Sequence, residues 1–174
     1  MENIKLTDTL FIYRDKNGID RLIYIIDPAK KKIMQILNMR EVENNVNEAV
    51  QKYIRFLNIN SEKNLSRIKL FAFLLKIKLY QEYILRILLG HMLFDEYDQL
   101  TKDNTFAFII AEYLLNKEPL SEENKSIIKD IRLFNKLYSS VKDVTFKMPE
   151  FYINDIYLNF ILTLKAENIS TQES

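Results

Sequence analysis

The pattern of apolar and polar residues is helical through most of the chain, and it is densest in apolar residues between Leu65 and Phe94. This stretch contains no proline, and apolar side chains fall on nearly every face of a helix. A helix that is apolar most of the way round has to be surrounded by other elements. Its polar residues Lys78, Glu82 and Arg86 are spaced four apart, which predicts one charged stripe facing solvent. We therefore predict a central helix over residues 65–94, buried in an α-helical core.

The first part of the chain has a different pattern, in which β-branched and aromatic residues gather in short runs. The runs 9–14 and 21–27 flank the pair Asn17-Gly18, which is a strong signal for a β-hairpin turn because both positions tolerate positive φ. The run 33–38 could form a third strand or begin the next helix, and the strand is favoured. An isolated hairpin is only marginally stable in water, so these strands are expected to pack on the helices or on another chain.

Beyond the strands, apolar residues recur at intervals of three and four, as they do along the buried face of a helix. Thr101 and Ser121 are predicted helix caps, and the acidic segment Asp95–Gln99 is expected to end the central helix. The helix after Ser121 is expected to bury Ile131 together with its other apolar residues. Besides the central helix, the spacing predicts helices over residues 41–57, 101–116, 121–138 and 150–165.

The predicted fold class is therefore mainly α, a bundle of about five helices around the central buried helix. A small N-terminal antiparallel β-hairpin or three-stranded meander precedes the bundle. Residues 1–39 are expected to form this β element, and residues 40–166 the α-helical domain. Residues 167–174 have little apolar material for packing and are expected to form a disordered tail.

The composition restricts the chemistry available to this chain. With 25 basic and 24 acidic residues the net charge is +1, which does not favour non-specific binding to phosphate backbones. Cysteine is absent, which excludes disulfides and thiolate chemistry and suits a cytoplasmic location. One histidine and two glycines offer neither a histidine-built metal site nor a phosphate-binding glycine loop. We therefore expect no cofactor, no metal and a protein that is not an enzyme.

The central helix is the one segment apolar enough to suggest a membrane span. Four charged residues lie in its middle, where each would cost several kcal/mol in lipid. They are Lys76, Lys78, Glu82 and Arg86. We therefore expect a buried helix and no membrane partner.

Arg86 and His91 are spaced as R-x-x-x-x-H on the central helix, and they are the candidate catalytic pair. A guanidinium can bind a phosphate, and an imidazole can transfer a proton near neutral pH. The pair resembles the ribonuclease motif of the HEPN family of all-helical domains, where the arginine and histidine meet across a dimer and promote attack of the RNA 2′-hydroxyl on its own phosphate. This resemblance implies an RNA-cleaving enzyme. The alternative is structural, with Arg86 closing the charged stripe and His91 lying near a helix end.

A basic cluster follows the second strand and consists of Lys30, Lys31 and Lys32. Its ammonium groups could contact nucleic-acid phosphates, in which case binding should weaken steeply as salt rises. The alternative is a solvated turn, since lysines are common beside exposed sheet edges.

An acidic cluster closes the central helix and consists of Asp95, Glu96 and Asp98. Three carboxylates could hold a hard cation, but the glycine-turned calcium loop is missing, and acids at a helix end commonly face water. The tyrosines and phenylalanines at helical spacing are assigned mostly to the core, and some of them to a surface that binds a partner.

The segment 46–120 contains a helix ending in VQKYIRFL, a polar loop, a longer helix containing FLLKIKLYQEYILR, and then LTKDNTFAFIIAEYLLNKEPL. This order resembles the helical domain of archaeal GINS subunits, in which a helix with an L-x-K-I-R-L pattern precedes a helix that begins L-T-E-E-E. The corresponding pieces are Lys76–Leu79 and Leu100–Asp103. GINS subunits are non-catalytic and pair an α-helical domain with a small β domain. They assemble into a tetrameric replisome scaffold that binds helicase and primase machinery.

The resemblance implies a GINS-like subunit with its small domain in front, although residues 1–39 are short for the β domain of that family. Together with the composition, it favours a non-catalytic helical interaction subunit of a larger complex, with DNA replication as its specific setting. Expected partners are other protein subunits, in a hetero- or homo-oligomer. A virus-encoded helical adaptor that binds a host partner is another form of the same class. RNA cleavage and nucleic-acid binding remain the alternatives from other classes.

Overall fold

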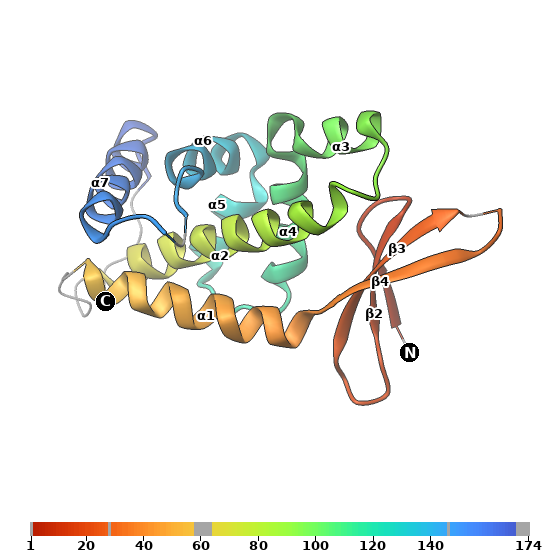
Figure 1. The fold of residues 1–174 in the computed structure, drawn as a ribbon. Helices are drawn as coiled ribbons and strands as arrows, with labels where there is room; N and C mark the ends of the chain where they lie inside the picture. Colours follow the sequence, from red (N-terminus) through yellow and green to blue (C-terminus); the bar gives the residue numbers. More distant parts are fainter. Residues whose placement is uncertain (1, 28, 58–63, 146, 170–174) are drawn as a thin grey trace.

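The computed structural model describes residues 2–27, 29–57, 64–145 and 147–169 of the chain. Strands come first and form a twisted sheet at one end of the molecule, and helices form the rest (Figure 1). The predicted class, mainly helical with a small antiparallel β element in front, is confirmed at this level. The numbers of strands and helices differ from the prediction.

The sheet is an antiparallel meander in the order β1-β2-β3-β4. Its strands are β1 (Glu2–Lys5), β2 (Leu10–Arg14), β3 (Asp20–Asp27) and β4 (Lys32–Asn38). Alternate residues of the middle strands are buried, among them Leu10, Ile12, Leu22 and Tyr24, so one face of the sheet packs against the helices. The run 33–38 lies in β4, so the strand favoured over a helix start is confirmed. Strand β1 was not predicted, because its four residues are too few to show an alternation.

The predicted hairpin turn joins β2 to β3. Gly18 has a φ of +75°, which a residue without a Cβ adopts at little cost. The Asp15 carboxylate accepts hydrogen bonds from the amides of Asn17 at 2.9 Å and Ile19 at 3.0 Å. The turn is therefore stabilised by hydrogen bonds to the aspartate side chain as well as by the glycine.

The helical domain surrounds α2, which runs through its middle (Figure 1). Its helices are α1 (Met39–Phe56), α2 (Leu65–Leu88), α3 (Phe94–Thr101), α4 (Thr105–Leu115), α5 (Glu122–Lys129), α6 (Ile131–Val141) and α7 (Glu150–Ala166), with a 3₁₀ turn at Lys102–Asn104. Helices α1, α4 and α6 pack directly on α2. Thirteen residues of α2 are buried, including Phe71, Leu74 and Tyr80, so the predicted central helix is confirmed.

Helix α2 ends six residues earlier than predicted. The amides of His91 and Met92 both donate to the carbonyl of Leu88, at 2.8 and 3.0 Å, and this turn redirects the chain. The acidic segment Asp95–Gln99 was expected to close the central helix, and instead it lies in the separate helix α3. Carboxylates in the first turn of α3 face its positive end, which favours a helix start there.

The predicted cap at Thr101 is wrong. Thr101 is the last residue of α3, and its hydroxyl donates to the carbonyls of Tyr97 and Asp98, both at 3.1 Å. Asp103 and Asn104 then take left-handed conformations with φ of 54° and 59°, and α4 begins at the next residue. Short polar side chains tolerate this region better than others do, so the pair turns the chain where a glycine would be expected.

The predicted helix after Ser121 is divided in two. Ser121 does cap α5, because its hydroxyl accepts from the amide of Asn124 at 3.1 Å. Asp130 is extended and caps a new helix, α6, by accepting from the amides of Arg132 and Leu133. The change of direction leaves Ile131 52% exposed, so its predicted burial is wrong.

The described part of the predicted tail contacts the helices. Glu167 pairs with Lys136, the amide of Ile169 donates to the carbonyl of Leu164 at 2.9 Å, and Ile169 packs against the core. Residues 170–174 lie outside the described residues, as do residues 58–63 of the predicted polar loop. No helix in the described ranges combines the length and apolar character that crossing a membrane requires.

A buried polar cluster fastens the sheet to the helices. Asp20, at the start of β3, is 4% exposed and accepts from Arg14 Nε at 2.7 Å, from the Tyr113 hydroxyl, and from Lys117 Nζ at 3.0 Å. Burial alone would raise the pKa of Asp20, but the hydrogen bonds from these three groups outweigh it and hold that pKa well below its ordinary value. The sheet therefore docks on the helices of its own chain.

The Asp20→Asn variant should test this fastening, because it leaves two cations without their shared carboxylate. We expect a loss of roughly 2–4 kcal/mol in the free energy of unfolding at pH 7, below the value for a fully buried pair because Lys117 and Arg14 reach solvent. Urea unfolding followed by circular dichroism measures it. The exposed Asp143→Asn is the matched control, and its effect should stay within about 0.5 kcal/mol.

The wild type and the Asp20→Asn variant should also lose stability to different extents at acidic pH. Because the pKa of Asp20 is lower in the folded than in the unfolded state, its stabilisation is complete above the unfolded value of about 4. It is lost as the pH falls from there towards the folded pKa. The wild type should therefore lose more stability than Asp20→Asn below about pH 4. If the free energy of unfolding fell equally with pH in the two proteins, the lowered pKa assigned to Asp20 would be contradicted.

Candidate interaction surface

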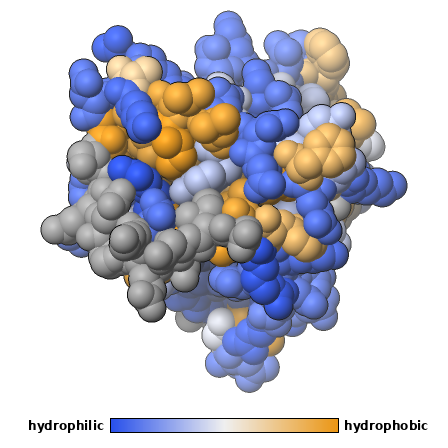
Figure 2. Space-filling model, turned by 90° about the vertical axis from the view of Figure 1, so that its left-hand side faces the viewer, coloured by the Kyte–Doolittle hydropathy of each residue, from blue (hydrophilic) through white to orange (hydrophobic). Residues whose placement is uncertain are grey.

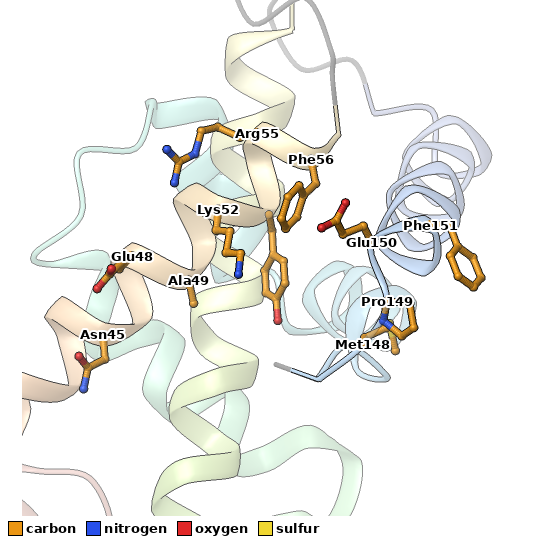
Figure 3. Close-up of a pocket in the computed structure, with 11 residues that line it drawn as sticks. Asn45, Glu48, Ala49, Lys52, Arg55, Phe56, Met148, Pro149, Glu150 and Phe151 are labelled. Carbon is orange, nitrogen blue, oxygen red and sulfur yellow. The ribbon is translucent and has the colours of Figure 1, made fainter.

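An open groove of about 740 Å³ lies between the second half of α1 and the start of α7. Tyr53 lies at its base, where its hydroxyl donates to the carbonyl of Thr145 at 2.9 Å. Figure 3 shows the lining, which combines charged and apolar groups from both sides. It comprises Asn45, Glu48, Ala49, Lys52, Tyr53, Arg55 and Phe56 from α1, Met148 and Pro149 from the segment before α7, and Glu150 and Phe151 from the first turn of α7.

The groove has the chemistry of a contact surface. Lys52 Nζ lies 5.7 Å from the centre of the Phe56 ring, so a cation is held beside an aromatic face. Glu150 faces Phe56 from the opposite side in Figure 3, whereas Phe151 points outward at the edge. Aromatic residues, methionine and arginine are enriched in surfaces that bind another polypeptide, and Phe56, Met148 and Arg55 supply all three here.

Apolar residues continue from the edge of the groove along the outer face of α7. Phe151, Leu158 and Leu162 are 60%, 57% and 54% exposed, and we refer to them as the α7 stripe. The opposite face of the helix supplies Ile153, Phe160 and Leu164 to the core. Figure 2 views the molecule from the side on which α7 lies, and apolar side chains gather there.

A second apolar surface lies at the turn between α2 and α3. Leu89, Leu93 and Phe94 are 63%, 77% and 79% exposed, and we refer to them as the α2–α3 surface. This turn lies towards the sheet, whereas α7 lies at the far side of the helical domain (Figure 1). The chain thus presents a group of three exposed apolar side chains at each of these two separate places.

The candidate catalytic residues lie near this second surface. Arg86 is exposed in the last turn of α2, and His91 is exposed in the turn that follows. Neither of them lines the groove between α1 and α7. The charged stripe in which Arg86 was placed begins as predicted, with an ion pair of 3.2 Å between Lys78 and Glu82.

The basic cluster at Lys30, Lys31 and Lys32 is exposed between β3 and β4. Lys31 adopts a φ of 52° there, and Lys32 begins β4. The cluster is at the tip of the sheet, away from the groove (Figure 1).

The acidic cluster is used in part to hold the sheet. Glu96 accepts hydrogen bonds from the hydroxyls of Thr9 and Tyr24, whereas Asp95 and Asp98 are exposed. Burial and the neighbouring Glu96 carboxylate raise the pKa of Tyr24 to about 12, which keeps its hydroxyl a donor. Within the described ranges, no three histidine, aspartate or glutamate side chains are grouped so that they could hold a metal ion.

A small polar cavity of about 290 Å³ opens beside the buried cluster, next to Asp20, Glu43 and Lys117. Asp20, Glu43 and Lys117 already have partners within the chain, since Lys117 lies 3.0 Å from Asp20 and 3.6 Å from Glu43. These contacts account for the cavity as part of the joint between sheet and helices.

The α7 stripe and the α2–α3 surface were not predicted from the sequence, because most leucines and aromatic residues were assigned to the core. A signal for the first was present in α7. Its apolar residues fall at 153, 160 and 164 on one face and at 151, 158 and 162 on the other, more than a helix with one buried face needs.

Comparison with known proteins found no matching family model, no matching curated protein and no matching solved structure. The exposed apolar surfaces and the groove therefore carry the functional interpretation.

Two leucine substitutions should distinguish the α2–α3 surface from the core beneath it. Leu88 is fully buried in the last turn of α2, and Leu88→Ala should lower the free energy of unfolding by about 2–5 kcal/mol. Leu93 is exposed five residues later, and Leu93→Ala should change it by less than about 0.5 kcal/mol. Urea unfolding of both variants makes the comparison. Equal losses would mean that Leu93 belongs to the core.

Proposed function

We propose that this protein is a non-catalytic subunit of a larger protein assembly, which it enters through the α7 stripe with its adjoining groove and through the α2–α3 surface. The observation that carries the proposal is the placement of large apolar side chains, each more than half exposed, at two separated positions. Contiguous apolar residues on a protein surface mark sites that other molecules cover. Two such sites allow one chain to join two partners.

A GINS-like replication subunit is the specific form of this proposal. The order of elements, an antiparallel sheet followed by a helical domain, agrees with the arrangement expected for such a subunit with its small domain in front. The sheet has one strand more than the meander predicted from sequence, within the same N-terminal segment. In this form the partners are proteins of the replication machinery.

Affinity capture with surface variants tests the proposal. The tagged full chain should retain defined proteins in near-stoichiometric amounts when purified from its source organism. Leu93→Asp with Phe94→Asp, and Leu158→Glu with Leu162→Glu, should each lose a different part of that set, because a carboxylate placed in an apolar contact is costly to desolvate. Quantitative mass spectrometry of the captured proteins is the measurement.

Ile33→Asp is the matched control, since Ile33 is an exposed apolar residue on β4, away from both surfaces. It should capture the same proteins as the wild type. Replication proteins in the captured set would support the GINS-like form. A set that stays unchanged in both double variants, or a wild type that retains no protein, would show the proposal to be wrong.

A further inference from the structure

The outer face of α7 carries a regular repeat that includes two charged residues. Positions 151, 155, 158, 162 and 165 are spaced four, three, four and three residues apart, so they lie on one face of the helix. Three of these positions hold the α7 stripe, and the other two hold Asp155 and Lys165, which are both exposed. A repeat of this kind is the seam along which a second helix packs.

The two charges restrict which helix can cover this seam. A charge placed between two packed helices is unfavourable unless the partner supplies the opposite charge at the same level. The covering helix must therefore present a cation opposite Asp155, an anion opposite Lys165, and apolar side chains opposite Leu158 and Leu162.

Helix α7 itself meets this requirement when it runs antiparallel. Positions 155 and 165 are symmetric about position 160, and so are positions 158 and 162. A two-fold axis at the level of residue 160 consequently places Asp155 opposite Lys165 of the second copy, and Leu158 opposite Leu162 of the second copy. Each of these contacts occurs twice, as in any two-fold interface.

A parallel arrangement does not satisfy the charges. It would place Asp155 opposite Asp155 and Lys165 opposite Lys165, and like charges at close range repel each other. The sequence of the seam therefore selects both a partner, which is a second copy of the chain, and a direction.

We propose that Leu158 and Leu162 of the α7 stripe, with Asp155 and Lys165, form the interface of a homodimer in which two α7 helices pack antiparallel about a two-fold axis at residue 160. The inference rests on the proposed function and names the partner of one of its two surfaces. The α2–α3 surface lies outside this interface (Figure 1) and stays open to a different protein.

The contact is modest in size. Seventeen residues of helix are about 25 Å long, and two such helices in contact form an interface at the lower end of the range for specific complexes. The dimer should therefore have a dissociation constant in the micromolar range, so that light scattering between about 5 and 100 µM follows its formation.

The test uses the purified full chain on a sizing column with light-scattering detection. The wild type should approach twice the chain mass of 20.8 kDa at the higher concentrations. Asp155→Lys and Lys165→Asp should each raise the dissociation constant of the dimer at least tenfold, since each of these charges then faces a charge of the same sign. An equimolar mixture of these two variants should dimerise again, and so should the chain that carries both substitutions.

Two further variants keep the test specific. Leu158→Glu with Leu162→Glu should be monomeric throughout the range, whereas Leu89→Glu, placed on the α2–α3 surface, should dimerise as the wild type does. Circular dichroism verifies that every variant is folded. The substituted positions are exposed, so their helical signal should equal that of the wild type.

Three results would overturn the inference. The first is a wild type that stays monomeric at about 100 µM, and the second is a dimer that neither single charge variant weakens. The third is a mixture that dimerises while the doubly substituted chain does not, which indicates parallel packing. A monomeric wild type would leave the proposed function to its own test, because capture of other proteins does not require self-association.

Discussion

The burial of α2 on almost all sides is the constraint on which the rest of the structure depends. Its apolar residues leave little of its surface for water, so the surrounding helices have to supply complementary apolar faces. One buried residue of α2 is charged. Lys76 is neutralised by Glu118, which follows α4, and by Glu43 of α1 at 3.6 Å. The placement of α1 and α4 is therefore set by charge as well as by apolar packing, because a lone buried ammonium group would be strongly destabilising.

These carboxylates and lysines connect the helical core with the sheet. Glu43 lies 3.6 Å from both Lys76 and Lys117, and Lys117 in turn contacts Asp20 of β3. A continuous row of alternating charges thus runs from the middle of α2 to the start of β3. Burial and the nearby Asp20 carboxylate raise the pKa of Tyr113, so its hydroxyl stays protonated and continues to donate within this row.

The features that can be predicted from sequence are those encoded by residues close together in the chain. The central helix, the hairpin at Gly18 and the cap at Ser121 each depend on a local pattern, and all three are present. The break at Asp130 depends on its side-chain hydrogen bonds, which compete with continued helix. The break at Asp103 depends on a left-handed backbone conformation. Apolar spacing records neither.

The polar cluster and the exposure of the α7 stripe could not be predicted from local sequence patterns, for a different reason. Asp20, Glu43, Lys76 and Lys117 come from β3, α1, α2 and the turn after α4, and they meet only after folding. Nothing in the sequence around any one of them therefore indicates the others. In α7 the apolar spacing is plain, but which of its two apolar faces is buried depends on how α7 packs against α6 and α1. Exposure of the α7 stripe is thus a property of the assembled fold.

The joint between β4 and α1 has a mechanical consequence. Asn38 is the last residue of the strand and also caps the helix, accepting from the amide of Arg40 at 2.9 Å, so no loop separates the two elements. A strand and a helix joined without slack cannot reorient independently. Helix α1 is about 27 Å long and packs on α2. Its far end is one wall of the groove, so one helix spans the distance from the sheet to the groove.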